Sequence, residues 1–306
     1  MSDESAWGRF RASRWFRLIW IVPAIVVVVV LGVLLARWLR DGPLADFLVT
    51  YPGSGTLPDW APVGFPAWLA WQHAINALFM LFIIRSGLQV HYLKRPQAFF
   101  TRNNTGLIKT KKPPRRISLE LWLHLTVDTL FVVNGVVFYV LIFATGQWTR
   151  IIPTNWDVFP NAVSAVVQYA SMDWPTEDGW VNYNGIQLLS YFFVVFLLAP
   201  AAIATGLRMS PAAMQRTVRF FPLELARRLH WPIMVTFLVF IAVHVTLVLA
   251  TGALRNLNHM YAGNDGDGWA GAIVFAVSLI VMAGAWVALR PVVIRTLAGT
   301  MGKVGR

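Results

Sequence analysis

The sequence predicts an all-α membrane protein with six transmembrane helices. Of its 306 residues, 57% are hydrophobic and only 13% are charged, and the mean hydropathy is +0.58. A soluble domain carries about 25% charged residues, and apolar runs long enough to cross a bilayer recur along this chain. The chain has no cysteine, which excludes thiolate-bound iron–sulfur clusters, disulfides and cysteine zinc sites.

Six apolar stretches account for this fold class. They are residues 17–37, 67–90, 119–145, 186–205, 229–251 and 269–289. The first is longer than the apolar part of a signal peptide and lacks a small-residue cleavage site, so it predicts a retained anchor. Three stretches end in a Thr-Gly pair, and we expect Gly146, Gly206 and Gly252 to close them as left-handed C-caps.

The positive charges predict the orientation of these spans. With the N-terminus in the cytoplasm, 21 of the 26 Lys and Arg residues lie on the cytoplasmic side, as the positive-inside rule requires. Both termini are therefore expected in the cytoplasm, with Arg37 and Arg40 as exceptions at the outer end of the first span. The outer loops are 38–66 and 146–185, and the basic inner loops are 91–118 and 208–228. The net charge of +12 then reflects basic cytoplasmic loops, and the partner expected is membrane lipid rather than nucleic acid.

Two histidines share one face of the fifth span. His230 and His244 are 14 residues apart in RRLHWPIMVTFLVFIAVHVTLVLATG, which returns to the same helix face within about 40° and separates the imidazoles by roughly 21 Å. One imidazole then lies near each edge of a hydrocarbon core about 30 Å thick. A helix needs this arrangement to hold two stacked haems, each of which takes one more histidine from another helix.

Depth pairs these two histidines with two others. His73 lies about two turns inside the outer end of the second span, level with His244. His124 lies near the inner end of the third span, level with His230. Intramembrane histidines are costly and usually functional, so four of them at two matched depths indicate ligation. We expect His73 and His244 to hold an outer haem and His124 and His230 an inner one.

Two charged residues inside the spans are further candidates for cofactor binding. Arg85 can extend to the interface or pair with a haem propionate. Asp128 lies one turn after His124 on the same face, where it can orient a ligand imidazole, pair with Arg85 or relay protons to a quinone. An interfacial polar role is expected for His91 and His259, although His91 could replace His124 as a ligand or line a quinone site.

Four segments resemble the di-haem cytochrome b561-like superfamily, which includes gamma subunits of formate dehydrogenases and cytochrome b subunits of thiosulfate-reductase-like and hydrogenase-like complexes. The segments are WQHAINALFMLFIIRSGLQVH, LWLHLTVDTLFVVNGVVFYVLIFATGQWTRIIP, YNGIQLLSYFFVVFLLAPAAIATGLRMS and ARRLHWPIMVTFLVFIAVHVTLVLATGALRNLNHMYAG. They cover roughly residues 66–262. The resemblance is strongest to bacterial cytochromes b that accompany molybdopterin-dependent oxidoreductases.

The resemblance implies a four-helix di-haem cytochrome b core with one added helix at each end, in the bacterial cytoplasmic (inner) membrane. The implied organisation is an N-terminal cytoplasmic segment and anchor helix at 1–40, an outer loop at 41–66, the core at 67–262, and a C-terminal transmembrane helix with a basic cytoplasmic tail at 263–306. The implied cofactors are two haem b groups. In the family the first and second core helices supply one ligand each and the fourth supplies two, at positions that match His73, His124, His230 and His244 here.

The function implied is electron transfer between membrane quinone and a partner oxidoreductase, of which this chain would be the electron-transfer subunit. The partner expected from the resemblance is a molybdopterin-dependent subunit, docked on the cytoplasmic side or on the acidic outer loop 146–185. One alternative is a stand-alone cytochrome b561-type quinol oxidoreductase. Another is a transporter or receptor without haem, although the chain shows no inverted repeat and no pair of broken helices.

Overall fold

The computed structural model describes residues 14–92, 94–105, 109–111, 113–174, 179–211 and 220–306. The expected cytoplasmic segment before residue 14 lies outside the described residues. The chain divides into two compact units. The first comprises Met1–Leu57, Ile152–Asp178 and Asn182–Ser190, and the second comprises Pro58–Ile151, Gly179–Val181 and Tyr191–Arg306.

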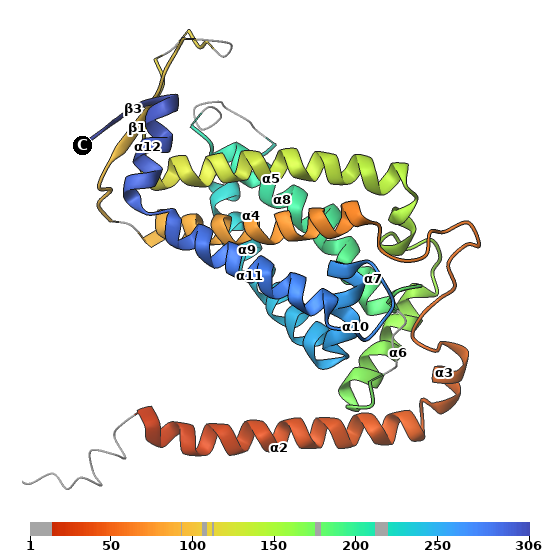
Figure 1. Cartoon of the computed structure of the whole chain (residues 1–306). Coiled ribbons are helices and arrows are strands. Elements are labelled where there is room, and N and C mark those ends of the chain that lie inside the picture. Colours follow the sequence, from red (N-terminus) through yellow and green to blue (C-terminus); the bar gives the residue numbers. More distant parts are fainter. Residues whose placement is uncertain (1–13, 93, 106–108, 112, 175–178, 212–219) are drawn as a thin grey trace, which may run out of the picture. The chain divides into compact units, whose positions relative to one another are not determined.

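Helices make up most of the described residues (Figure 1). Within them, six helical segments are long and apolar enough to cross a membrane. They are α2 (Arg14–Asp41), α4 (Ala67–Tyr92), α5 (Leu119–Ala144), the continuous run of α7 (Gly185–Phe192), η2 (Phe193–Leu198) and α8 (Ala199–Met209), then α9 (Leu223–Ala250) and α11 (Ala270–Ala288). The predicted all-α membrane protein with six transmembrane helices is therefore confirmed.

In the first unit, α2 is apolar on all sides over most of its length and polar at its C-terminal end. Its residues 18–31 are apolar and exposed, as expected of an anchor that faces lipid. Near its C-terminal end, Arg37 Nε donates to the Ser171 carbonyl at 3.0 Å, and Arg40 forms ion pairs with Asp41 and Asp173. The two arginines that were exceptions to the charge rule are thus bound to polar groups of their own unit.

The segment 152–174 contains a helix that the sequence did not predict, α6 (Val158–Ala170). It packs against α2, and its Asn161 Oδ1 accepts a hydrogen bond from the Gly53 N–H at 3.0 Å. The start of α7 lies directly on α6, because a Cβ at Gly185 would be 2.5 Å from the Ala162 nitrogen. A short helix α3 (Ala45–Thr50) completes the described part of this unit.

In the second unit, α4 packs along α5 and α8 packs along α9 (Figure 1). Ser118 caps the N-terminus of α5 by accepting a hydrogen bond from the Leu121 N–H at 3.2 Å, a favourable use of a serine. A buried apolar cluster joins α4 and α5 to α12 (Pro291–Met301) and to β1 (Phe99–Arg102). Its members are Phe82, Ala98, Phe100, Leu119, Trp122, Leu123, Val127, Ile294 and Ala298.

The C-terminal residues pair with the loop between α4 and α5. The strands β2 (Arg116–Ser118), β1 (Phe99–Arg102) and β3 (Gly302–Gly305) form an antiparallel sheet in the order β2-β1-β3. In this register Phe100 pairs with both Ile117 and Val304. The close approach at Gly302, where a Cβ would lie 2.3 Å from the Thr101 carbonyl oxygen, requires a glycine.

The segment after α9 is held by one buried asparagine. It contains the short α-helix α10 (Ala253–Leu257) and the π-helix η3 (Asn258–Ala262). Asn258 is 1% exposed, donates to the carbonyls of Gly266 and Gly268 at 2.6 and 2.7 Å, and accepts from the Gly271 N–H at 2.7 Å. These three hydrogen bonds connect η3 to the start of α11.

One of the three expected left-handed glycine C-caps is present, at Gly146 after α5, with a φ angle of 74°. Gly252 after α9 also has a positive φ angle, 132°, but it is not in the left-handed helical conformation. The prediction for Gly206 is wrong, because α8 continues through it and ends at Met209. In the turn after Gly206, Arg208 is buried at 8% exposed and donates to the Phe221 carbonyl at 2.8 Å.

Candidate functional site

Two histidine pairs lie between helices of the second unit. His73 of α4 and His244 of α9 have ring centroids 6.3 Å apart. His124 of α5 and His230 of α9 have ring centroids 6.4 Å apart. We call these the outer and the inner histidine pair, after the predicted orientation of the chain. The structure thus brings together the same partners that membrane depth predicted.

The ring spacing in each pair fits two imidazoles on opposite sides of one metal ion. A metal–imidazole bond is about 2 Å long, and the centre of a five-membered ring with bonds of about 1.33 Å lies roughly 1.1 Å beyond the ligating nitrogen. Two rings that share one ion then have centroids roughly 6.2 Å apart, close to the spacing in both pairs. Each pair offers two ligands, so a metal ion bound there would take its other ligands from a prosthetic group.

Hydroxyl groups contact both imidazoles of the inner pair. Ser86 Oγ of α4 lies 2.9 Å from His124 Nδ1, and Thr205 Oγ1 of α8 lies 2.8 Å from His230 Nδ1. Both hydroxyl residues are almost completely buried. The inner pair is therefore held by hydrogen bonds from two helices other than the ones that carry the histidines.

A glycine follows each of these hydroxyl residues and lies against the same imidazole. A Cβ at Gly87 would be 3.3 Å from His124 Cε1, and a Cβ at Gly206 would be 3.7 Å from His230 Cε1. Thr205 and Gly206 thus lie within α8 and contact His230. They do not end the helix. The same dipeptide pattern, a hydroxyl residue followed by glycine, serves both imidazoles.

The outer pair has mainly aromatic neighbours. Phe240, one turn before His244 on α9, stacks on it with ring centroids 5.6 Å apart, and the ring of Tyr191 meets His244 edge-on at 6.1 Å. The Tyr261 hydroxyl of η3 lies 3.5 Å from His73 Nδ1, which is at the limit of a hydrogen bond. Ring packing therefore positions the outer pair more than hydrogen bonding does.

Arg85 binds the C-terminal end of α11. Its guanidinium donates to the carbonyls of Trp286 and Leu289 at 2.8 and 2.9 Å and lies over the Trp286 ring at 4.4 Å. It thereby supplies donors to carbonyls that the end of a helix leaves unpaired. The pairing of Arg85 with a haem propionate stays a prediction.

Asp128 and His91 have different relations to the inner pair. Asp128 Oδ2 lies 3.5 Å from His124 Nε2, the ring nitrogen opposite to the one that Ser86 contacts. His91, at the end of α4, is exposed and stacks on Trp231 with ring centroids 4.1 Å apart. Of these two residues, Asp128 is the one placed against a candidate ligand.

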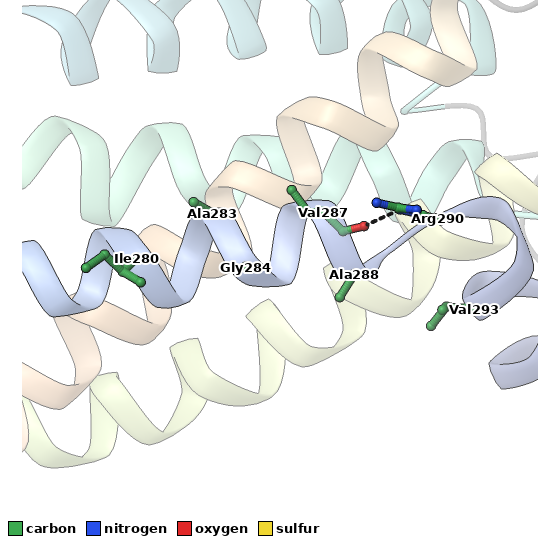
Figure 2. A pocket seen from close by; sticks show the side chains of 7 residues that line it. All are labelled: Ile280, Ala283, Gly284, Val287, Ala288, Arg290 and Val293. Carbon is green, nitrogen blue, oxygen red and sulfur yellow. Dashed lines mark hydrogen bonds between the residues drawn. The ribbon is translucent and has the colours of Figure 1, made fainter.

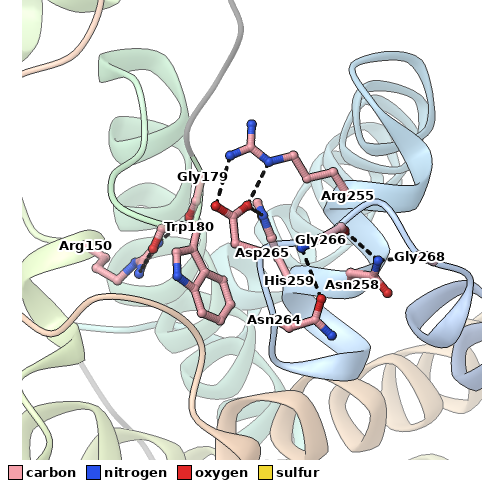
Figure 3. Close-up of polar contacts among 10 residues, drawn as sticks. All are labelled: Arg150, Gly179, Trp180, Arg255, Asn258, His259, Asn264, Asp265, Gly266 and Gly268. Atoms are coloured by element: carbon pink, nitrogen blue, oxygen red, sulfur yellow. Dashed lines mark hydrogen bonds and ion pairs between the residues drawn. The ribbon is translucent and has the colours of Figure 1, made fainter.

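A buried arginine connects two distant segments of the second unit, and the sequence did not predict it (Figure 3). Arg150 of η1 (Gln147–Arg150) is 2% exposed. It donates to the carbonyls of Gly64 and Trp180 at 3.2 and 3.0 Å and to that of Gly179, and it lies over the Phe65 ring at 4.6 Å. An isolated Arg in an outer loop carries no sequence signal of this role, because its partners are backbone groups far along the chain.

His259 belongs to a neighbouring ion-pair network (Figure 3). It is 4% exposed, and its Nε2 lies 2.7 Å from Asp265 Oδ1. Arg255 donates to both oxygens of Asp265, at 2.8 and 3.2 Å. These hydrogen bonds, from Arg255 first and then from His259, lower the pKa of Asp265 to about 2. His259 is thus a buried structural partner of Asp265, outside the apolar spans.

An open cavity of about 750 Å³ lies along α11 and across the break before α12 (Figure 2). Its lining is apolar apart from Arg290, whose Nε donates to the Val287 carbonyl at 3.2 Å. None of the paired histidines lines it. We therefore treat it as part of the surface that faces lipid and not as the cofactor site.

Acidification should loosen the Asp265 network. The pKa of Asp265 is lowered from 3.8 to about 2 in the folded chain, so its ion pairs stabilise the segment 253–268 above about pH 4 and are lost as the pH falls from 4 toward 2. We expect amide hydrogen exchange in this segment, corrected for intrinsic rates, to accelerate in that range. Asp265→Asn should show the faster exchange already at pH 6, whereas Asp267→Asn, at an exposed position in the same loop, should not. Wild-type exchange in Asp265→Asn at pH 6 would contradict the role of the network.

The sequence matches the family described as prokaryotic cytochrome b561 over residues 64–263, more than half of the 306-residue chain. No match is found among curated proteins or among solved structures. The matched region contains all four paired histidines, and the family comprises membrane b-type cytochromes that bind haem b. The cytochrome b561-like resemblance is confirmed, and with its six spans this multi-pass membrane protein belongs to the prokaryotic cytochrome b561 family.

Proposed function

We propose that this chain is a di-haem b cytochrome of the bacterial cytoplasmic membrane, with both termini in the cytoplasm. It would transfer electrons between the quinone pool and a partner oxidoreductase subunit that contains molybdopterin. The observation that carries the proposal is the presence of two histidine pairs, each with the ring spacing that a shared metal ion requires.

The outer pair, His73 and His244, would hold one haem, and the inner pair, His124 and His230, would hold the other. Because α9 supplies one histidine to each pair, its 14-residue spacing sets the two sites roughly 21 Å apart along the helix axis. Haem b bound there supplies reversible one-electron transfer. The chain contributes the axial imidazoles, fixes their orientation and surrounds the outer pair with aromatic rings that exclude water.

Quinone and the partner are supported by different considerations. Quinone is an electron carrier that dissolves in the bilayer, where both histidine pairs would lie, and Asp128 is the acidic side chain placed to move a proton there. The molybdopterin partner rests on the resemblance of the quoted segments to cytochromes that accompany such enzymes. A stand-alone quinol oxidoreductase would use the same four histidines, so only the partner distinguishes it.

Removing one histidine from each pair tests the ligand assignment. We expect unaltered protein to hold two haem b per chain, and His244→Ala and His230→Ala to hold one each, because either change leaves one pair with a single ligand. A pyridine haemochrome assay on detergent-purified protein, with protein measured by amino-acid analysis, gives the ratio. His91→Ala is the control and should retain two haems, since His91 is exposed and stacked on Trp231.

Several results would reject this assignment. Two haems in His244→Ala would show that the outer pair is not a ligand pair. One haem in the unaltered protein would leave one of the two pairs structural. A protein that holds no haem, although it is made with ample haem supply, would overturn the electron-transfer proposal as a whole.

The two glycines beside the inner pair offer a matched comparison. Gly87→Ala places a methyl group 3.3 Å from His124 Cε1, which forces the ring to move, whereas Gly206→Ala places one at an ordinary contact distance of 3.7 Å from His230 Cε1. We expect about tenfold weaker retention of the inner haem in Gly87→Ala and unchanged retention in Gly206→Ala. Transfer of haem to excess apomyoglobin measures this, and equal transfer from both variants would contradict the packing of His124 on α4.

Purification of the tagged chain from native membranes in mild detergent tests the partner. We expect a second protein to co-purify with near-stoichiometric molybdenum, and the haems of the complex to be reduced by a short-chain quinol. Without molybdenum, but with haems that quinol reduces and an added soluble acceptor reoxidises, the stand-alone quinol oxidoreductase would be the better description.

A further inference from the structure

We propose that Ser86 of α4 and Thr205 of α8 are positioning residues that hold the inner histidine pair in the one tautomer able to bind a metal ion through Nε2. The proposal rests on the proposed function, because it concerns the haem that His124 and His230 would hold. It assigns a specific task to two uncharged residues that contact the imidazoles of the inner pair.

The Ser86 hydroxyl has three neighbouring acceptor atoms but only one proton to donate. Ser86 Oγ lies 2.6 Å from the Phe82 carbonyl oxygen of its own helix, 3.2 Å from that of Ile83, and 2.9 Å from His124 Nδ1. A hydroxyl has one proton to donate, and serine in a helix commonly donates it to the carbonyl four residues back. Because Ser86 donates its only proton to the Phe82 carbonyl, its Oγ can only accept a hydrogen bond from His124 Nδ1. His124 must therefore carry its own proton on Nδ1.

Thr205 repeats this arrangement on another helix. Thr205 Oγ1 lies 2.8 Å from the Ala201 carbonyl oxygen, 3.0 Å from that of Ala202, and 2.8 Å from His230 Nδ1. Its proton is directed to its own helix in the same way, so it accepts a hydrogen bond from His230 Nδ1. In both cases a hydroxyl oxygen on a neighbouring helix accepts a hydrogen bond from Nδ1 of the histidine.

The consequence is a defined tautomer for both rings. A neutral imidazole protonated at Nδ1 has its free lone pair at Nε2. His124 and His230 would then both offer Nε2 as ligand atoms, and their ring centroids are already separated as two ligands of one ion would be. The two hydroxyl groups thus fix the ligating tautomer of the inner pair in the protein without haem.

Asp128 is the partner that His124 would have if its proton were on Nε2 instead of Nδ1. If His124 carried its proton on Nε2, it would donate to Asp128 Oδ2, which is 3.5 Å away. That distance is at the limit of a hydrogen bond, whereas the contact with Ser86 at 2.9 Å is of ordinary length. Ser86 therefore orients this imidazole, and Asp128 lies on its ligand side.

In the part of the chain that the structure describes, the outer pair has no hydroxyl at ordinary hydrogen-bond distance from Nδ1. The nearest hydroxyl to His73 Nδ1 is that of Tyr261, at 3.5 Å, and the contacts of His244 are with the rings of Phe240 and Tyr191. An acceptor on Nδ1–H makes an imidazole a stronger donor to its metal ion, which favours the oxidised ion and lowers its reduction potential. Ser86 and Thr205 should therefore lower the potential of the inner haem and leave the outer haem unaffected.

A redox titration of the purified two-haem protein, followed by absorbance, tests this role without measuring activity. Thr205→Val keeps the shape of the side chain and removes the hydroxyl, whereas Thr205→Ser keeps the hydroxyl. Thr236→Val is the matched control, because Thr236 makes the same bond to its own helix, to the Pro232 carbonyl at 2.9 Å, from an exposed position on α9. Ser86→Ala tests the second hydroxyl independently.

We expect Thr205→Val and Ser86→Ala each to shift the reduction equilibrium of the inner haem about tenfold toward the reduced form, which is 59 mV for one electron. Thr205→Ser and Thr236→Val should match the unaltered protein. Loss of the inner haem from Thr205→Val but not from Thr205→Ser would also support the proposal.

Unchanged potentials in both Thr205→Val and Ser86→Ala would overturn the proposal, as would a change in Thr205→Ser as large as that in Thr205→Val. In each of these cases the unaltered protein still holds two haems. Unaltered protein without an inner haem contradicts the proposed function instead, so the two failures are distinguishable.

Discussion

The arrangement of this membrane domain depends on one constraint, which is that an imidazole inside a bilayer needs a partner. Helix α9 carries two imidazoles at two depths, and hydrocarbon offers neither of them a hydrogen bond. The neighbouring helices place partners beside both imidazoles. At one level Thr205 of α8 contacts His230 by a hydrogen bond and α5 brings His124. At the other level the rings of His73 and Tyr191 lie against His244. The packing around α9 thus follows from where its polar groups must be satisfied.

Much of this could be predicted from the sequence, because the features concerned depend on rules that act along one helix. A run of about 20 apolar residues marks a span whatever surrounds it, and the rise per residue converts a spacing into a depth. This arithmetic places His73 with His244 and His124 with His230, and the structure brings the same rings together. The family that matches residues 64–263 is also the one that the segments around these histidines resemble.

The remaining features could not be predicted, because each depends on a contact between distant parts of the chain. The Thr205-Gly206 pair has the composition of a helix end, and only the presence of His230 beside it shows that it lies within a helix. The strand β3 pairs with β1 about 200 residues earlier, and neither segment has a strong strand pattern. Nothing in the sequence indicated that the Arg85 guanidinium binds the carbonyls that end α11, because these lie about 200 residues further along the chain.

The two histidine pairs differ in where their supporting groups come from, and this difference has a physical consequence. The hydroxyls that hold the inner pair belong to α4 and α8, which lie within two of the six membrane-spanning helical segments. The hydroxyl nearest to the outer pair belongs to η3, a short segment held by Asn258 and by the ion pairs of Asp265. Short segments of this kind open locally more readily than long helices do. The geometry of the inner pair is therefore set by the membrane-spanning helices, and that of the outer pair depends in part on a polar network outside them.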